Sequence, residues 1–235
     1  MNLTSLRDEL RQKASPERAV QSQRFFKIGP GEYGEGDQFL GLTVPQTRAW
    51  VPQTDALTEK EVLTLLHSGW HEERLLALFI LIRRFKKARR DEAAQRHIIE
   101  LYLANTKCVN NWDLVDTSAP HLLGVWLLKR DRSILARLAS SNSLWEQRIA
   151  VLTTQTFIRA GDFSDTFQLC HRFLTHPHDL MHKACGWMLR EIGNRDDLEL
   201  RSFLDYHSSK MPRTMLRYAI EKLPENDRKD YLARK

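Results

Sequence analysis

Cysteine is scarce in this sequence, and long apolar runs are absent. The three cysteines, Cys108, Cys170 and Cys185, are too few and too scattered for a disulfide framework or a paired Cys-x-x-Cys zinc site. The longest strongly apolar run, Leu75–Ile82, is far shorter than the roughly 20 residues that cross a membrane. The first residues are charged throughout and lack the apolar centre of a signal peptide. We therefore expect a cytoplasmic protein with reduced thiols, associated with the nucleoid if the source is bacterial.

Metal ligands and phosphate-loop residues are also missing. His176 and His178 flank a proline, but no further ligand follows at the spacing of a metal site. The glycine-rich stretch Lys27–Asp37 lacks a Gly-Lys-Ser or Gly-Lys-Thr sequence, and its two glutamates and one aspartate would repel phosphate. We expect neither a metal nor a cofactor. We interpret the glycine-rich stretch as a structured connector between N-terminal helices.

Apolar content and charge set the broad class. Hydrophobic residues make up 42% of the 235 residues, which is enough for a continuous core. The formal net charge is +6, and the isoelectric point is about 9.3. A basic protein gains from counterion release when it binds phosphates, so the charge favours an anionic partner such as nucleic acid. A solvated basic surface with no such partner also fits, and the charge alone does not decide between them.

Helical periodicity is frequent after residue 58, and strand-like alternation bounded by turn residues is nearly absent. The predicted class is therefore all-α. Because most connections are short, neighbouring helices should pack antiparallel. The expected helices cover residues 3–13, 16–26, 44–50, 59–67, 71–87, 90–104, 111–129, 131–139, 143–160, 162–174, 179–195, 198–207, 212–223 and 225–233.

An internal repeat relates these helices. The segment Glu72–Leu78 reappears as Glu146–Leu152, 74 residues later. Half that spacing falls on Asn111, and a further step of about 35 residues falls on Lys183. A two-helix unit of about 35 to 37 residues, without the tetratricopeptide signature, predicts HEAT-like repeats stacked in an α-α superhelix. We predict a single domain of this type over residues 1–235.

Such a stack curves, and its concave face collects the same helix ends from successive repeats. Residues 1–57 would supply N-terminal helices and the connector, and residues 58–235 would supply the stacked repeats. Helix N-termini that carry Arg and Lys suit phosphates, so a DNA duplex is a natural ligand for the concave face. The side chains expected there are Arg74, Trp112, Arg148 and Trp187.

Trp112 and Asp116 are four residues apart and therefore share one side of a helix, where an aromatic ring would stand beside a carboxylate. Asp113 lies near the helix start and is assigned to capping or to interaction with the helix dipole. The pattern leaves other interpretations open. Asp116 also fits a solvated or salt-bridged acid, Arg148 fits a surface ion pair, and Trp187 fits a core position.

Matching motifs of one known family follow each other in order along nearly the whole sequence. They are Phe25-Phe26-Lys27 with the glycine-rich stretch through Phe39-Leu40-Gly41, Trp112-Asp113-Leu114-Val115-Asp116, Trp145-Glu146-Gln147-Arg148, Gly186-Trp187-Met188-Leu189-Arg190-Glu191 and Leu216-Arg217-Tyr218-Ala219-Ile220-Glu221-Lys222-Leu223. In these motifs and their joint spacing the chain resembles the AlkD-type alkylpurine DNA glycosylases, which are made of HEAT-like repeats. The long glycine-rich insertion is not shared by every member of that family.

The resemblance also implies roles for individual residues. It places the catalytic carboxylate on Asp116, the aromatic partners on Trp112 and Trp187, and the arginine that contacts the DNA backbone on Arg148. A further aromatic of the family's site most nearly matches Phe25, where a tyrosine is more familiar. Arg74 and Lys183 are the additional DNA-binding residues that we expect from the repeat pattern.

The implied activity is that of a monofunctional DNA N-glycosylase in base excision repair. Such an enzyme hydrolyses the N-glycosidic bond of cationic N3- or N7-alkylated purines in duplex DNA, and the resemblance implies capture of the lesion without a deep base pocket. We expect a monomer that binds double-stranded DNA with alkylated purines and needs no membrane. Two alternatives remain. One is a noncatalytic HEAT-like protein that recognises damaged or branched DNA, and the other is a protein-interaction solenoid with an apolar or mixed groove.

Overall fold

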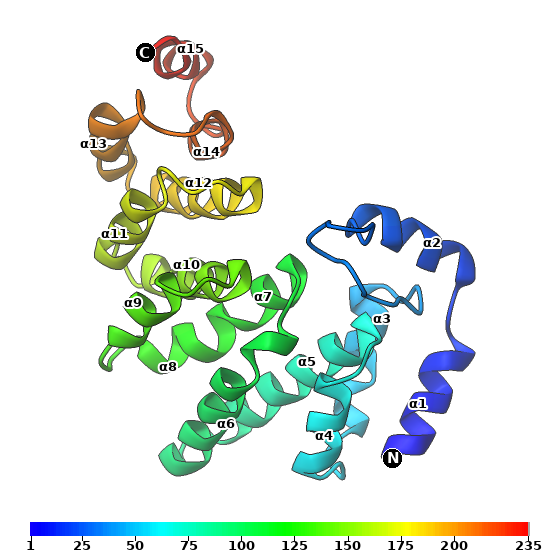
Figure 1. Ribbon diagram of the computed structural model, residues 1–235. Helices are drawn as coiled ribbons and strands as arrows, with labels where there is room; N and C mark the ends of the chain where they lie inside the picture. The colour runs from blue at the N-terminus through cyan, green and yellow to red at the C-terminus, as the bar shows by residue number, and fades with distance from the viewer. Residues whose placement is uncertain (235) are drawn as a thin grey trace. The chain divides into compact units, whose positions relative to one another are not determined.

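The computed structural model describes residues 1–234 and consists of helices and their connections (Figure 1). Within these residues there is no strand apart from one isolated β-bridge between Gln38 and Trp70. The predicted all-α class, of the α-α superhelical type, is therefore confirmed. No helix in residues 1–234 has the length and apolar character needed to cross a membrane.

The chain divides into two compact units, one over Met1–Leu114 and one that begins at Val115. The prediction of a single repeat domain stays a prediction. The first unit contains α1 (Leu3–Gln12), α2 (Pro16–Phe25), α3 (Val44–Ala49), the 3-10 helix η1 (Val51–Gln53), α4 (Glu59–Leu66), α5 (His71–Lys87), α6 (Glu92–Ala104), the 3-10 helix η2 (Thr106–Cys108) and the start of α7 (Trp112–Ser118).

Helix α5 forms the centre of the first unit. Its middle, Leu75–Ile82, is apolar on every side and buried, as expected for a helix covered all round, and it contacts α3, α4 and α6. The first turn of α5 is different. His71, Glu72, Glu73 and Arg74 are all less than 5% exposed, although such side chains are rarely buried unless they are paired. The N-terminal end of α5 therefore holds a cluster of buried polar side chains.

The second unit stacks its helices in two layers (Figure 1). Helices α10, α12 and α14 pack side by side in one layer, and α9, α11 and α13 lie against them in the other. A Cβ atom on Gly186 would lie 2.5 Å from the carbonyl oxygen of Met215, so the bare glycine allows α14 to pack closely on α12. The bounds are α8 (Val125–Leu127), α9 (Ser133–Ala139), α10 (Leu144–Arg159), α11 (Ser164–Arg172), α12 (Asp179–Gly193), α13 (Asp197–His207), α14 (Arg213–Ala219) and α15 (Glu225–Ala233).

The helix that starts at Trp112 continues through a π-helical stretch, Pro120–Gly124, before α8. The amide of Gly124 donates to the carbonyl of Ala119, five residues back, over 3.0 Å. Pro120 has no N–H to donate to the carbonyl four residues before it, so the regular α-helical hydrogen-bond pattern is interrupted here. Sequence periodicity predicted one uninterrupted helix here and did not reveal this stretch.

Candidate active site

Trp112 lies in an aromatic cluster of the first unit. The ring of Phe26 stacks on the indole with 5.3 Å between ring centroids, and Phe25 meets the indole edge-on at 5.6 Å. Phe25 is 64% exposed and Trp112 is half-buried. The structure thus brings together two of the predicted aromatic residues at an accessible surface.

Phe26 is the member of this cluster that sequence analysis missed. Its ring also stacks on Phe39, at 5.0 Å between centroids, and lies 4.9 Å from the ring of His71. Phe26 therefore connects Trp112 to the buried end of α5. The pair Phe25-Phe26 stood in a matching motif, but a local pattern does not tell which of two adjacent rings turns inward.

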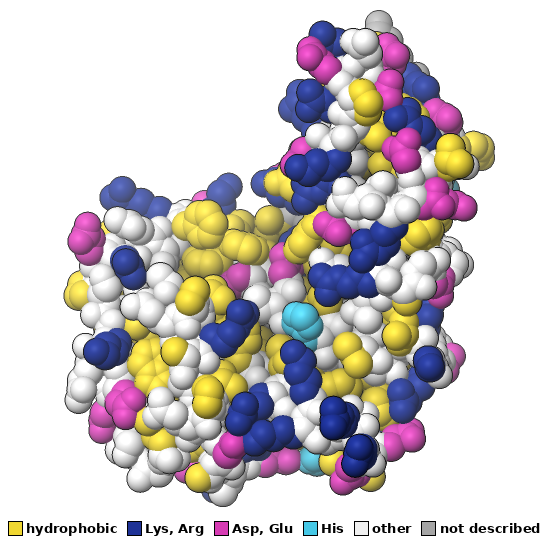
Figure 2. Space-filling model, turned by 180° about the vertical axis from the view of Figure 1, so that it is seen from behind, with side chains coloured by type: hydrophobic (Ala, Val, Ile, Leu, Met, Phe, Trp, Pro, Cys, Tyr) yellow, Lys and Arg dark blue, Asp and Glu magenta, His cyan; other side chains and the backbone are white. Residues whose placement is uncertain are grey.

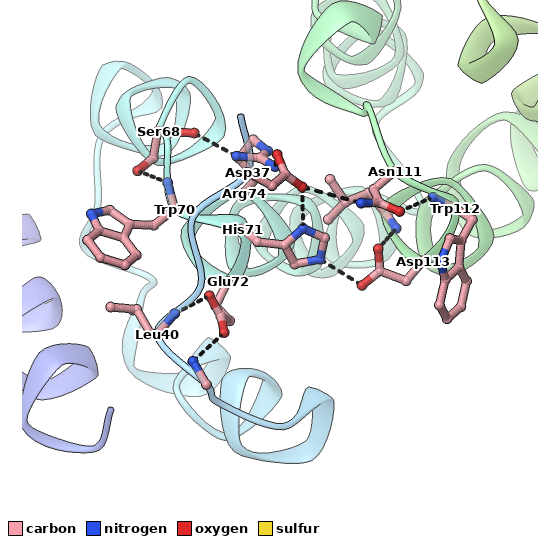
Figure 3. A network of polar contacts seen from close by, with 12 residues as sticks. Asp37, Leu40, Ser68, Trp70, His71, Glu72, Arg74, Asn111, Trp112 and Asp113 are labelled. Atoms are coloured by element: carbon pink, nitrogen blue, oxygen red, sulfur yellow. Dashed lines mark hydrogen bonds and ion pairs between the residues drawn. The ribbon is translucent and has the colours of Figure 1, made fainter. Parts of the chain in front are cut away.

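His71 bridges two carboxylates, those of Asp37 and Asp113 (Figure 3). Its Nδ1 lies 3.0 Å from Asp37 Oδ2, and its Nε2 lies 2.8 Å from Asp113 Oδ2. Carboxylate oxygens accept hydrogen bonds, so both ring nitrogens donate and the imidazole carries its second proton. Asp37 belongs to the glycine-rich connector, which is thereby tied to the starts of α5 and α7.

The charges of this bridge shift the pKa values of its members. Burial alone lowers the pKa of His71, but the negative charges and hydrogen bonds of Asp113 and Asp37 outweigh burial and raise this pKa to about 9. Burial alone raises the pKa of Asp37, but hydrogen bonding to His71 and the charges of Arg74 and His71 hold it below its usual range. At neutral pH His71 is therefore a buried cation and Asp37 a buried anion.

Arg74 is engaged inside the first unit. It is 4% exposed, its Nη2 donates to Asp37 Oδ1 over 2.5 Å, and its Nη1 donates to the carbonyl of Ser68 over 2.9 Å. The repeat pattern predicts that Arg74 contacts DNA phosphates. This placement favours an internal role, in which Arg74 holds the end of the connector.

The start of α7 is fixed by side chains of the same network. Asn111 accepts a hydrogen bond from the amide of Trp112, and Asp113 accepts one from the amide of Leu114, both over 2.8 Å. Amides in the first turn have no partner within a helix, so these side chains satisfy two of them. Asn111 also donates to Asp37 over 3.3 Å. Asp113 therefore caps the helix, as predicted, and also forms an ion pair that was not predicted.

Glu72 holds the chain that follows the connector. Its carboxylate accepts hydrogen bonds from the amides of Leu40, Gly41 and Leu42 over 2.8 to 3.1 Å. Gly41 has φ of +79°, and a Cβ atom there would lie 2.2 Å from the carbonyl oxygen of Ser15. Only glycine fits at that position, because the backbone is left-handed and in contact with its neighbour.

A cavity of about 670 Å³ opens beside the cluster within the first unit. Its walls include the rings of Phe25, Phe26 and Phe39, and its polar groups include His71 and Glu72. Those two side chains are already hydrogen-bonded inside the protein. The cavity thus offers aromatic stacking surface, while its His71 and Glu72 groups are engaged inside the protein.

The second unit holds Asp116 and Arg148 as a pair. Nε and Nη2 of Arg148 donate to the two carboxylate oxygens of Asp116, each over 2.8 Å, and Nη1 donates to the carbonyl of Leu180 over 2.6 Å. The side chain of Arg148 is 5% exposed, whereas that of Asp116 is 14% exposed. Such a two-bond pair fixes the plane of the carboxylate. Of the two partners, the carboxylate is the more accessible.

The remaining predicted residues of the second unit lie on α12. Trp187 is half-buried, and its indole nitrogen donates to Glu191 over 3.1 Å, one turn further along the helix. Lys183 keeps 39% of its side chain exposed and pairs with Asp179 over 2.8 Å, also one turn away. Lys183 is therefore reachable by an external anion in a way that Arg74 and Arg148 are not.

Histidines cluster near the start of α12. Burial lowers the pKa of His176 and of His178, and the charge of His182 lowers both further, so both rings are neutral at neutral pH. His178 accepts the amide hydrogen bond of Leu180 over 3.1 Å, which makes it the cap of α12. In residues 1–234 no group of three or more His, Cys, Asp or Glu is arranged to hold a metal ion.

Lys and Arg side chains are dispersed over the face drawn in Figure 2, with acidic side chains among them. Some surface cations of the protein are paired, as Arg83 and Lys87 are with Asp55. On this face, positive and negative side chains are therefore interspersed (Figure 2).

Known proteins include a family that matches this sequence and a solved structure with a similar fold. Residues 6–223 match the model of a protein family described as DNA alkylation repair enzyme. The fold is similar to that of a solved structure described as a predicted DNA alkylation repair enzyme from Enterococcus faecalis. That similarity has a TM-score of 0.70 at 15% sequence identity and covers 90% of this chain and 97% of the other. No curated protein matches the sequence.

Proposed function

This chain belongs to the family of DNA alkylation repair enzymes, and on that premise we propose that it is a DNA glycosylase that releases cationic alkylated purines from duplex DNA. Alkylation at N3 or N7 gives the purine a positive charge and makes it a good leaving group. The glycosidic bond then breaks as the sugar becomes an oxocarbenium-like cation. An enzyme accelerates this step with a negative group held where the positive charge develops.

The pair of Asp116 and Arg148 is the observation that carries this proposal. The permanently charged guanidinium favours the anionic form of the carboxylate and fixes its orientation through two hydrogen bonds of 2.8 Å. A preoriented anion needs no rearrangement when the sugar becomes positive, and this is the condition for strong electrostatic catalysis. We assign to Asp116 the stabilisation of that charge and the orientation of the attacking water.

The aromatic residues supply affinity for the cationic nucleotide in this proposal. Trp112 lies one helical turn before Asp116 on α7, and Phe25 extends the aromatic surface around it. Trp187 is the second indole that we assign to the substrate. The faces of indole rings attract cations, and each contact contributes about 0.5 to 2 kcal/mol.

Base release decides between this activity and DNA binding without catalysis. We expect the protein to release free N7-methylguanine or N3-methyladenine from methylated duplex DNA, with chromatography and mass spectrometry identifying the base. Unmodified duplex of the same sequence is the control and should release nothing. If the protein retards duplex DNA at low salt but liberates no base, it is a noncatalytic DNA-binding protein and the proposal is wrong.

Salt dependence separates the cations that contact DNA from those that act inside the protein. Lys183→Ala should weaken duplex binding and reduce the slope of log affinity against log salt by about 1, because one phosphate contact is lost. Arg148→Ala should leave the slope unchanged while base release falls, because its guanidinium already binds Asp116 and Leu180. Fluorescence anisotropy with a labelled duplex at several salt concentrations measures both slopes. A flattened slope for Arg148→Ala would instead support the phosphate contact expected from the resemblance.

A further inference from the structure

The buried bridge of Asp37, His71 and Asp113 joins three segments that lie far apart in the sequence (Figure 3). Asp37 is the last residue of the glycine-rich connector, His71 is the first residue of α5, and Asp113 is the second residue of α7. All three side chains are less than 9% exposed. The connector is therefore anchored by charge at the point where α7 begins.

The charges in this bridge balance. Two carboxylates, Asp37 and Asp113, face two cations, the imidazolium of His71 and the guanidinium of Arg74. The thiol of Cys108, from η2, also lies near Arg74, and burial raises the pKa of that thiol. A change of one charge in the bridge would leave another charge buried without a partner, which is costly in a dry interior.

The bridge ends on the two residues that flank Trp112. Asn111 and Asp113 accept hydrogen bonds from the amides of Trp112 and Leu114. Asp113 is itself a member of the bridge, and Asn111 donates to Asp37. The backbone conformation at Trp112 is therefore fixed by two neighbouring side chains, and these are hydrogen-bonded to Asp37 and His71.

The other end of the connector fixes the ring that covers Trp112. The amide of Gly34 donates to the carbonyl of Lys27 over 3.0 Å, and a Cβ atom on Gly34 would lie 2.4 Å from the carbonyl oxygen of Phe26. The connector thus folds back tightly on the residue that stacks on Trp112. One segment controls both the backbone of Trp112 and its neighbouring ring.

We propose that this connector and its buried bridge are a positioning device for Trp112, with Asp37 and His71 as positioning residues. They hold the indole in the orientation in which it receives the alkylated nucleotide, a role that rests on the proposed glycosylase function. An apolar cluster of the same volume would stabilise the fold as well as buried ion pairs do. Buried charges add directionality, because each of their hydrogen bonds has a preferred geometry. A site that holds a ring in place within a fraction of an ångström needs such directional contacts.

The test replaces Asp37 by asparagine, which keeps the shape and removes one charge. The probe is fluorine NMR of protein labelled with 5-fluorotryptophan, in which the resonance of Trp112 is assigned by its absence from Trp112→Phe. We expect the Trp112 resonance to shift and broaden in Asp37→Asn, while those of Trp126 and Trp187 stay in place. Asp55→Asn is the matched control, since Asp55 also pairs with cations of α5 but lies outside the bridge. It should leave the Trp112 resonance unchanged.

A second arm needs no substitution. In the wild-type protein the Trp112 resonance should move reversibly as the pH rises through about 9, where His71 loses its proton and can no longer donate to both carboxylates. Because this measurement uses the wild-type protein, it tests the proposal even if Asp37→Asn fails to fold. A Trp112 resonance that is unchanged both in folded Asp37→Asn and across this pH range overturns the proposal.

Activity gives the third readout and separates this inference from the proposed function. In single-turnover assays Asp37→Asn should slow base release by about tenfold to a hundredfold while affinity for undamaged duplex stays within about twofold, because misplacement of a contact acts on the chemical step. If the wild-type protein releases no base, the glycosylase proposal fails, and the Trp112 resonance still decides whether the bridge positions the indole. If base release in Asp37→Asn equals that of the wild type, the bridge does not serve catalysis.

Discussion

Asp116→Asn should lower the rate of base release from duplex DNA that contains N7-methylguanine by orders of magnitude, while affinity for the same DNA changes little. Asparagine keeps the shape of aspartate but carries no negative charge, so it cannot stabilise the developing cation of the sugar. Loss of one preoriented electrostatic group in an active site commonly costs about a hundredfold to a thousandfold in rate. Single-turnover release with excess protein measures the chemical step directly.

The chain offers a matched control for this substitution. Asp165 pairs with Arg132 over 2.6 Å in the same unit, and their side chains are 23% and 21% exposed. Asp165→Asn therefore removes the negative charge of an arginine-paired aspartate away from α7, and Arg132 keeps its second carboxylate partner, Asp162. It should retain the wild-type rate, whereas Asp116→Asn should not, and circular dichroism should show both variants folded. Equal base release by Asp116→Asn and wild type would remove Asp116 from the mechanism.

The helices of this fold were predictable because each is marked locally. Apolar residues recur with helical spacing, and capping residues such as Thr43 and Thr58 precede the helices that they start. The predicted helix over residues 212–223 is shorter in the structure, where α14 ends at Ala219. The π-helical stretch after α7 has no comparable mark, because periodicity does not distinguish a widened turn from a regular one.

The candidate site was predictable only in part, for a related reason. Trp112 and Asp116 could be placed on one side of a helix from their spacing alone. The repeat placed Arg148 and Trp187 on the same face, and family resemblance added their roles. The pairing of Asp37 with His71 spans 34 residues and depends on how the connector folds back. No local pattern encodes such a contact, and the connector could be recognised only as structured.

The burial of two arginines was also not predictable from sequence spacing. Arg74 and Arg148 occupy the repeat positions predicted for a basic face, yet both are only 4% exposed and are paired with carboxylates inside the protein. Sequence spacing gives the helix end on which a cation lies. It does not tell whether a carboxylate from another segment, here Asp37 or Asp116, pairs with that cation and whether the pair is buried.

His71 should make the folded protein less stable as the pH rises above neutrality. Its pKa is about 9 in the folded protein and about 6.5 when unfolded, so the folded state binds the proton more tightly. The resulting stabilisation is fully present below pH 6.5 and is lost as the pH rises through about 9. The two pKa values imply a loss of roughly 3 kcal/mol in the free energy of unfolding across this range. Urea unfolding followed by tryptophan fluorescence at several pH values measures it.

The other histidines with shifted pKa values and Cys108 affect stability outside the range from pH 6.5 to 9, in which His71 acts. The pKa values of His176, His178 and His207 are lowered, so their titration affects stability below pH 6.5, and that of Cys108 is raised, so it acts above pH 9. Asp37→Asn should flatten the dependence between these limits, because it removes one of the two carboxylates that raise the pKa of His71. His97→Gln is the control, since His97 pairs with Glu59 at the exposed surface and its loss should preserve the wild-type slope. If Asp37→Asn and the wild type lose stability equally between pH 6.5 and 9, His71 is not the titrating group, and the buried cation is absent from the bridge.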